Sequence, residues 1–235
     1  MAWRIPQVQP CLDDDELAGL TDTVRRDWLT EGPHAERFLT EILAQTGARH
    51  GVLAPNGTLG LFLALLALDL PRGSEILIPS FTFFASASAA VFAGLHPVFV
   101  DVDPQTFNLD VDTLDTLVTD QTAAIMPVGV YGQAPPMERI AEFAARHGLK
   151  VIEDAAQLYG VTYRGRHAGT FGDVGVISFF ADKTITTGEG GVVLTDDDVL
   201  HTRLRLLRNQ GREHSGTFIH EGLGMNFRVT DMQCA

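Results

Sequence analysis

Short apolar runs alternate with helix-like segments through most of the chain, and this alternation restricts the possible folds more than any other feature. Each run has the length and the β-branched or apolar content of a buried strand. The runs are EILIPS from Glu75, PVFVDVD from Pro97, AAIMPVGVYG from Ala123, KVIEDAAQ from Lys150 and VGVISFF from Val174. Residues 83–95, 110–118 and 137–148 lie between them and have the apolar spacing of crossover helices. The pattern predicts an α/β fold with three α/β/α layers, a mostly parallel central sheet and helices on both of its faces.

The domain organisation is simple in the sequence. The chain has 235 residues, of which 45% are hydrophobic and 20% charged, and no repeat, low-complexity tract or linker divides it. We expect residues 1–235 to form an N-terminal segment and one large domain. The final residues, NFRVTDMQCA, look like the opening of a helix with Thr230 or Asp231 as its N-cap, so we expect a terminal domain to be missing from this chain.

Charge and cysteine content exclude several classes of partner. The formal net charge of −13 disfavours nucleic acid and anionic membrane surfaces as main partners, because an acidic surface repels both. Residues 1–20 lack the apolar core of a signal peptide, and the apolar run from Leu59 is too short to span a bilayer. Cys11 and Cys234 lie at opposite ends of the sequence and form no metal-binding cluster. We expect a cytoplasmic protein without a disulfide framework or a metal site.

Polar residues follow several of the predicted strands. In open parallel sheets, ligands bind at the carboxyl ends of the strands, so these residues are the first candidates for a site. They are Asn56, Gly57 and Thr58 after RHGVLAP, Thr82 and Phe83 after EILIPS, Asp154 and Gln157 around the end of KVIED, and Ser178 and Lys183 after VGVI.

One group of candidates has the features of a phosphate site. Gly57 and Thr58 open a helix and offer unpaired backbone N–H groups and a hydroxyl, and Ser178 offers a second hydroxyl. Each has a simpler explanation, because NGT before a helix is often only a cap and a serine at a strand end often bonds neighbouring backbone.

Asp154 and Lys183 are the candidates for chemistry. A carboxylate at the end of a buried strand is costly unless it meets a cation, which would be an arginine or a protonated pyridine nitrogen. A lysine near an apolar strand loses hydration, which favours the neutral amine that condenses with a carbonyl, although a solvated loop lysine is the commoner case. Gly188, Gly190 and Gly191 permit a tight turn after Lys183.

A phosphate site, a buried carboxylate and a reactive amine together match the needs of pyridoxal 5′-phosphate (PLP). The nucleotide motifs GxGxxG before a helix and GxxxxGK[ST] do not occur.

Ordered sequence blocks along nearly the whole chain resemble the DegT/StrS-type sugar aminotransferases, which are PLP-dependent enzymes of fold type I. The blocks are WLTEGPHAERF (28–38), NGTLGLFLAL (56–65), PSFTFFASASA (79–89), PVFVDVDPQTFNLD (97–110), VIEDAAQ (151–157), GTFGDVGVISFFADKTITTGEGG (169–191) and GMNFRVTDMQ (224–233).

The resemblance implies a role for each site residue. Lys183 would hold PLP as a Schiff base and shuttle protons, and Asp154 would pair with the pyridine nitrogen. Phe83 would stack on the ring and Gln157 would bind its 3′-oxygen. Gly57, Thr58 and Ser178 would bind the phosphate, with Asn226 donated by the neighbouring subunit of a homodimer. The implied reaction moves an amino group from L-glutamate to a keto group on a nucleotide-linked sugar.

The resemblance leaves several functions open. Family members continue past the TDMQ block into a small C-terminal domain, so the chain is expected to lack that domain and could be inactive alone. Leu158 and Tyr159 replace a smaller residue and a histidine of many members, which leaves the sugar and the reacting carbon undetermined. A sugar dehydratase that uses pyridoxamine phosphate is the rival function among enzymes, but such relatives carry a histidine where Lys183 stands. Outside the enzymes, the chain could be a non-catalytic regulatory sensor or a purely structural or dimerising domain.

Overall fold

The computed structural model describes residues 8–214 and 216–235, so the start of the segment predicted to lack a signal peptide lies outside the described residues. The helices are α1 Asp14–Arg25, α2 Pro33–Thr46, α3 Gly57–Leu68, α4 Phe84–Phe92, α5 Met137–His147, α6 Asp198–Arg208 and α7 Asp231–Cys234, with a 3₁₀ helix, η1, over Val111–Thr116. The strands are β1 His50–Ala54, β2 Glu75–Pro79, β3 His96–Val100, β4 Thr122–Ile125, β5 Lys150–Asp154, β6 Thr162–Tyr163, β7 Arg166–His167, β8 Val174–Ser178 and β9 Gly191–Thr195.

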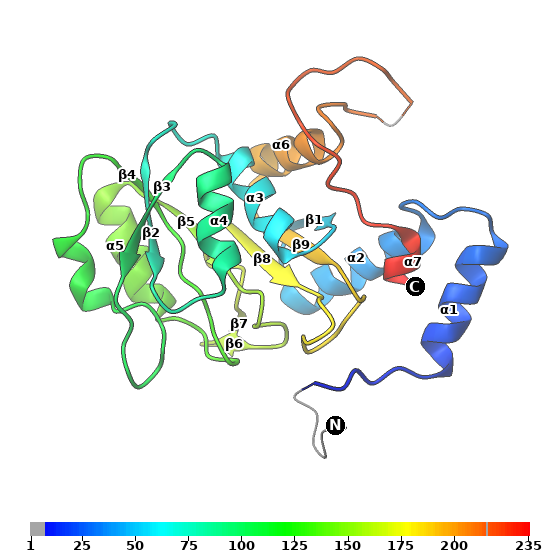
Figure 1. Ribbon diagram of the computed structural model, residues 1–235, viewed down its shortest axis with the longest axis horizontal. Coiled ribbons are helices and arrows are strands. Elements are labelled where there is room, and N and C mark those ends of the chain that lie inside the picture. The colour runs from blue at the N-terminus through cyan, green and yellow to red at the C-terminus, as the bar shows by residue number, and fades with distance from the viewer. Residues whose placement is uncertain (1–7, 215) are drawn as a thin grey trace, which may run out of the picture.

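The central sheet has the strand order β1-β9-β8-β5-β4-β2-β3 (Figure 1). Strands β8, β5, β4, β2 and β3 are parallel, whereas β9 pairs antiparallel with both β8 and β1. Strand β1 therefore has the same direction as the parallel set, and its carboxyl end lies at the same edge of the sheet. This confirms the predicted α/β fold with a mostly parallel sheet.

Helices cover both faces of the sheet and enclose separate apolar cores. Helices α3, α4 and α6 pack on one face against side chains such as Ile76, Ile152 and Val176. On the other face, α2 packs against β1, β8 and β9, and α5 with η1 packs against β2, β4 and β5. Helix α3 is apolar on all sides because it lies between the sheet and helices α4 and α6. The result is the predicted three-layer arrangement.

Three elements differ from the sequence-based expectation. Residues 110–118 contain only a short 3₁₀ helix, η1, capped by the Asp110 carboxylate, in place of a crossover α-helix. Its Val, Asp and Thr residues are poor α-helix formers, which favours a short 3₁₀ turn. The run from Ala123 ends as a strand at Ile125, because Pro127 follows. Residues 162–167 form a hairpin, β6-β7, that the sequence analysis did not predict.

The end of the chain matches the expected helix start. Thr230 caps α7, and its hydroxyl and the Gln233 side chain form a capping box. Asp231 is buried and accepts a 2.8 Å hydrogen bond from the Ala35 N–H at the start of α2. Within the described ranges, no helix has both the length and the apolar content needed to cross a bilayer.

Candidate functional site

A cavity of about 380 Å³ opens at the edge of the sheet where the parallel strands end. Segments that follow β1, β2, β4, β5 and β8, together with the turn before β9, form its wall. The predicted site residues on that wall are Gly57, Thr58, Phe83, Asp154, Gln157, Ser178 and Lys183. The structure therefore brings together every predicted site residue except Asn226.

One end of the cavity is the N-terminus of α3. Asn56 caps this helix, because its side chain accepts a 2.9 Å hydrogen bond from the Leu59 N–H. Among the described residues, the N–H groups of Gly57 and Thr58 have no acceptor. Ser178 lies beside them, and its Oγ already accepts the Phe180 N–H at 3.3 Å, which leaves the hydroxyl proton free to donate. Two amides, the Thr58 hydroxyl and the Ser178 hydroxyl are thus available as donors at a positive helix end, an arrangement suited to holding an anion.

Glycines allow the backbones around this end to approach closely. A Cβ on Gly57 would lie 2.9 Å from the Ser178 Cβ, and a Cβ on Gly191 would lie 2.9 Å from the Asn56 carbonyl carbon. Gly188 has a φ of 76°, which glycine adopts without strain. The glycine-rich turn after Lys183 therefore brings β9 against the start of α3.

Asp154 is the buried acid of the cavity, with 5% of its surface exposed. Burial raises the pKa of the Asp154 carboxyl, while a hydrogen bond from Ser86, the Ala156 N–H and the nearby Lys183 charge oppose that rise. Among the ion pairs of the described residues, none joins Asp154 to an arginine. The arginine explanation that the sequence left open is therefore not supported.

Lys183 follows β8 and lines the same cavity. Its Nζ lies 3.1 Å from Asp182 Oδ1, and only 19% of its side chain is exposed. The solvated loop lysine of the simpler explanation would be far more exposed. The charge of Lys183 lowers the pKa of Asp154, so the lysine amine and the aspartate carboxylate are electrostatically coupled.

Phe83 and Gln157 complete the wall. Phe83 precedes α4 and is 74% exposed, so its ring is free to cover a ligand. Gln157 Oε1 accepts the Tyr131 N–H at 2.8 Å. Because this contact fixes the orientation of the side-chain amide, the Nε2 group is left to donate into the cavity.

Asn226 lies outside the cavity. It is exposed, forms an isolated bridge with Asn209, and accepts the Arg228 N–H through its own side chain at 3.2 Å. Its proposed role on the site of a neighbouring subunit is compatible with this position and stays a prediction.

Sequence reasoning left several residues of the site without a role. Thr82 follows its strand in the sequence without an assigned role, and Ser86, which bonds Asp154, was not singled out. Both lie in the segment that follows β2, and this position after the carboxyl end of a strand was the available signal. Gly129 lines the cavity and has no room for a side chain, because a Cβ would lie 2.2 Å from Leu158 Cδ1.

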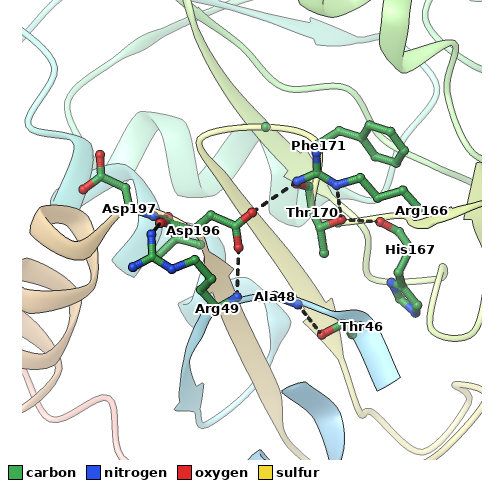
Figure 2. A network of polar contacts seen from close by, with 12 residues as sticks. Thr46, Ala48, Arg49, Arg166, His167, Thr170, Phe171, Asp196 and Asp197 are labelled. Carbon is green, nitrogen blue, oxygen red and sulfur yellow. Dashed lines mark hydrogen bonds and ion pairs between the residues drawn. The ribbon is translucent and has the colours of Figure 1, made fainter. Parts of the chain in front are cut away.

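A polar network at the end of the sheet away from the cavity holds the loop that leads into β8 (Figure 2). Arg166 donates from Nε to Thr170 Oγ1 at 2.9 Å and pairs with Asp196 at 3.3 Å. Asp196 also accepts the Arg49 N–H at 2.9 Å, so the network connects the β6-β7 hairpin with β1 and the end of β9. From the other side, the buried Glu153 carboxylate accepts the N–H groups of residues 169, 171 and 172. Contacts from both sides therefore fix the loop that precedes β8, and β8 ends at Ser178 in the cavity wall.

The fold and the site define a class of protein. A mostly parallel α/β/α sheet with a helix N-terminus, a buried aspartate and a lysine at its carboxyl edge is the large-domain architecture of fold type I PLP-dependent transferases. The DegT/DnrJ/EryC1/StrS aminotransferase family model matches residues 10–235, so the chain belongs to that family. This confirms the resemblance found in the sequence.

Two curated relatives are similar in sequence over most of this chain. GDP-perosamine synthase of Caulobacter vibrioides is 42% identical over 99% of this chain and 63% of the relative. UDP-N-acetyl-3-dehydro-alpha-D-glucosamine 3-aminotransferase of Acidithiobacillus ferrooxidans is 39% identical over 94% of this chain and 60% of the relative. The chain thus spans less than two thirds of the length of these relatives.

Two solved structures are similar in fold. An aminotransferase from Psychrobacter cryohalolentis superposes with a TM-score of 0.91 at 34% identity, covering 96% of this chain and 60% of that one. The E. coli GDP-4-keto-6-deoxy-D-mannose-3-dehydratase with bound hydrated PLP gives a TM-score of 0.91 at 26% identity, covering 97% of this chain and 65% of that one.

Proposed function

We propose that this chain is the cofactor-binding part of a PLP-dependent aminotransferase that transfers an amino group from L-glutamate to a keto group on a nucleotide-linked sugar. The observation that carries the proposal is the convergence of Gly57, Ser178, Asp154 and Lys183 on one cavity. The names of the curated relatives, one acting on a GDP-linked and one on a UDP-linked sugar, support the substrate class. We also propose that residues 1–235 form the N-terminal segment and the large domain of such an enzyme.

The residues of the cavity fit PLP. The phosphate requires several donors, and the start of α3 with Ser178 supplies them in a recess that a Cβ on Gly57 would fill. The ring nitrogen requires an acid that stabilises its protonated form, and Asp154 is a buried carboxylate without an arginine partner among the described residues. The aldehyde requires an amine, and Lys183 is the lysine on the cavity wall.

When bound, PLP supplies an electron sink that lets an amino group pass between an amino acid and a carbonyl carbon. Lys183 Nζ would hold the cofactor through its aldehyde and would move the proton at the reacting carbon of the substrate. Asp182 lies 3.1 Å from Nζ and orients it while it is charged.

The other residues orient the ring and exclude water. Asp154 would keep a proton on the ring nitrogen, because a buried carboxylate strongly favours a neighbouring cation. Gln157 Nε2 would donate to the ring oxygen, and Phe83 would cover the ring. Ser178 Oγ and the N–H groups of Gly57 and Thr58 would hold the phosphate.

Lys183 also distinguishes the proposal from the dehydratase function. The fold of the E. coli dehydratase is closely similar, so the fold alone does not separate the two activities. The sequence resemblance associates the dehydratase branch with a histidine at this position, and this chain has the lysine that transamination requires.

A homodimer with shared sites is part of the proposal. Phe84, Val91 and Phe92 on α4 are large, apolar and exposed, which is typical of a surface that a partner covers. Asn226 lies outside its own chain's cavity, as expected for a residue that serves the neighbouring subunit.

The cofactor assignment is tested by absorption spectroscopy of the chain incubated with PLP and dialysed. We expect a visible Schiff-base band in the wild type that L-glutamate removes, and no band in Lys183→Ala. Lys183→Arg keeps the charge but cannot form the Schiff base, so it separates covalent attachment from charge. A wild-type band that survives unchanged in Lys183→Arg would contradict the assignment.

The shared site is tested by mixing two inactive variants. Lys183→Ala and Asn226→Ala chains are expected to regain a fraction of sites with both residues intact when subunits exchange, because in a mixed dimer both defects fall on one site and leave the other intact. The readout is the glutamate-dependent loss of the Schiff-base band, with each variant alone as control. A mixture no more active than the sum of its components, despite exchange shown by mass spectrometry, would contradict a shared site.

A further inference from the structure

A chain of two hydroxyl groups, from the partly buried Thr82 and the buried Ser86, leads to Asp154. Ser86 Oγ lies 2.7 Å from Asp154 Oδ2, and Thr82 Oγ1 lies 2.7 Å from Ser86 Oγ. Ser86 lies in α4 and is fully buried, whereas Thr82 precedes the helix and lines the cavity. The strand end of β5 and the start of α4 are thus joined through two short contacts.

The direction of these hydrogen bonds follows from the number of protons. Ser86 has one hydroxyl proton and two nearby acceptors, Asp154 Oδ2 at 2.7 Å and the Phe83 carbonyl at 3.3 Å. The shorter contact to a carboxylate is the stronger one, so the proton lies toward Asp154. Ser86 can then only accept from Thr82, and the Thr82 hydroxyl donates to it.

The groups around the Asp154 carboxylate indicate the role of the Ser86 hydroxyl. The groups that face its carboxylate are Ser86 through Oδ2, the Ala156 N–H at 3.2 Å from Oδ1, and the charge of Lys183. Glu153, the adjacent acid, bonds the 169–172 loop on the other side of the strand. If Lys183 gives up its charge to a bound ligand, Ser86 becomes a principal stabiliser of the ionised carboxylate.

We propose that Thr82 and Ser86 are positioning residues that hold Asp154 ionised and correctly oriented for a cationic ring nitrogen. The inference rests on the proposed function, because it assigns the two hydroxyls a task toward the same cofactor. A ring nitrogen keeps its proton only while the facing carboxylate is charged, and Thr82 strengthens the Ser86 donor by polarising it.

The first test compares PLP with an analogue in which a C–H group replaces the ring nitrogen. Ser86→Ala is expected to weaken the binding of PLP roughly tenfold, as for loss of a charge-assisted hydrogen bond, and to leave the binding of the analogue unchanged. Thr82→Val is expected to act in the same direction with a smaller loss, and Thr82→Ser to restore the wild-type affinity. Ser88→Ala, on the same helix with its hydroxyl on the Ala85 carbonyl, is the matched control.

The outcomes separate this inference from the proposed function. Equal losses for PLP and the analogue would show that Ser86 only shapes the cavity, and no loss for either would show that it does not act on Asp154; both overturn the inference while PLP binding stands. If the wild type binds neither ligand, the proposed function fails as well.

The second test needs no cofactor. In the chain labelled with ¹³C at aspartate carboxyls, Ser86→Ala is expected to shift the Asp154 titration to higher pH, with Asp154→Asn used to assign the signal. An unchanged titration in a variant whose other aspartate signals are also unchanged would overturn the inference.

Discussion

At the scale of single residues, burial makes the ionised Asp154 carboxylate unfavourable in the folded chain, and Ser86 and Lys183 offset this only in part. Burial raises its pKa above the ordinary value of 3.8, which means that the folded chain ionises this group less readily than the unfolded chain. Its contribution to stability is therefore full below pH 3.8 and is lost as the pH rises through the folded-state pKa. A protonated ring nitrogen would reverse this effect, so the same residue that weakens the empty fold favours the cofactor.

Replacing Asp154 by asparagine is expected to remove this pH dependence. The free energy of unfolding of Asp154→Asn, relative to wild type, should rise with pH above 3.8 and level off above the folded-state pKa of the carboxyl. Urea unfolding of the cofactor-free chain across this range measures the difference. A difference that stays flat, or that falls as the pH rises, would contradict the burial argument. The same variant should lose affinity for PLP.

At the scale of elements, the site depends on how closely β9 approaches the start of α3. Gly191 opens β9 and pairs with both Ala54 and Ser178, the last residues of β1 and β8. This antiparallel insertion places the turn after Lys183 directly beside the anion site. The loop before β8 is fixed by different contacts, from Glu153 and Arg166.

Gly191→Ala is expected to disturb the anion site through the backbone. The new Cβ would lie 2.9–3.0 Å from Asn56 and Gly57 backbone atoms, which cannot rotate away as a side chain would. We expect a loss of roughly 1–3 kcal/mol in the free energy of unfolding, typical of overpacking, and weaker binding of PLP. Urea unfolding and a PLP titration measure the two effects.

Gly222→Ala is the matched control, because the contact of its Cβ would be an ordinary 3.7 Å from Leu206 Cδ2. If Gly191→Ala behaved like this control in both measurements, the close approach of β9 would not matter for the site.

At the scale of the whole molecule, the cavity joins segments that follow five strands of one sheet, from Asn56 near the start of the chain to Glu189. A ligand that contacts all of them can bind only the folded chain. Ligand binding is therefore coupled to the stability of the sheet as a whole.

PLP is expected to stabilise the chain against heat. At a free concentration one hundred times the Kd, a ligand of the folded state contributes about 2.7 kcal/mol, which corresponds to a rise in Tm of roughly 5–10 °C for a domain of this size. Differential scanning calorimetry with and without PLP measures the shift, and Lys183→Ala should reduce it. Equal shifts for PLP and inorganic phosphate would mean that only the anion site contributes.

Much of the fold and of the site could be predicted from local sequence. The strands from Glu75, Lys150 and Val174 are buried apolar runs of the right length, and their parallel direction follows from the helices between them. Since parallel strands end at one edge, residues such as Gly57, Asp154 and Ser178 were expected to lie together, and the structure places them on one cavity.

The sequence by itself determined the class of fold, the family and the residues with chemical potential, because periodicity, turn residues and motif order are local properties of the chain. Only the tertiary structure decided that β9 enters between β1 and β8 and that Ser86, 68 residues from Asp154, donates to its carboxylate. The physical reason is that a helical face is visible in the sequence as a spacing, whereas the group it meets depends on how the helix packs on the sheet.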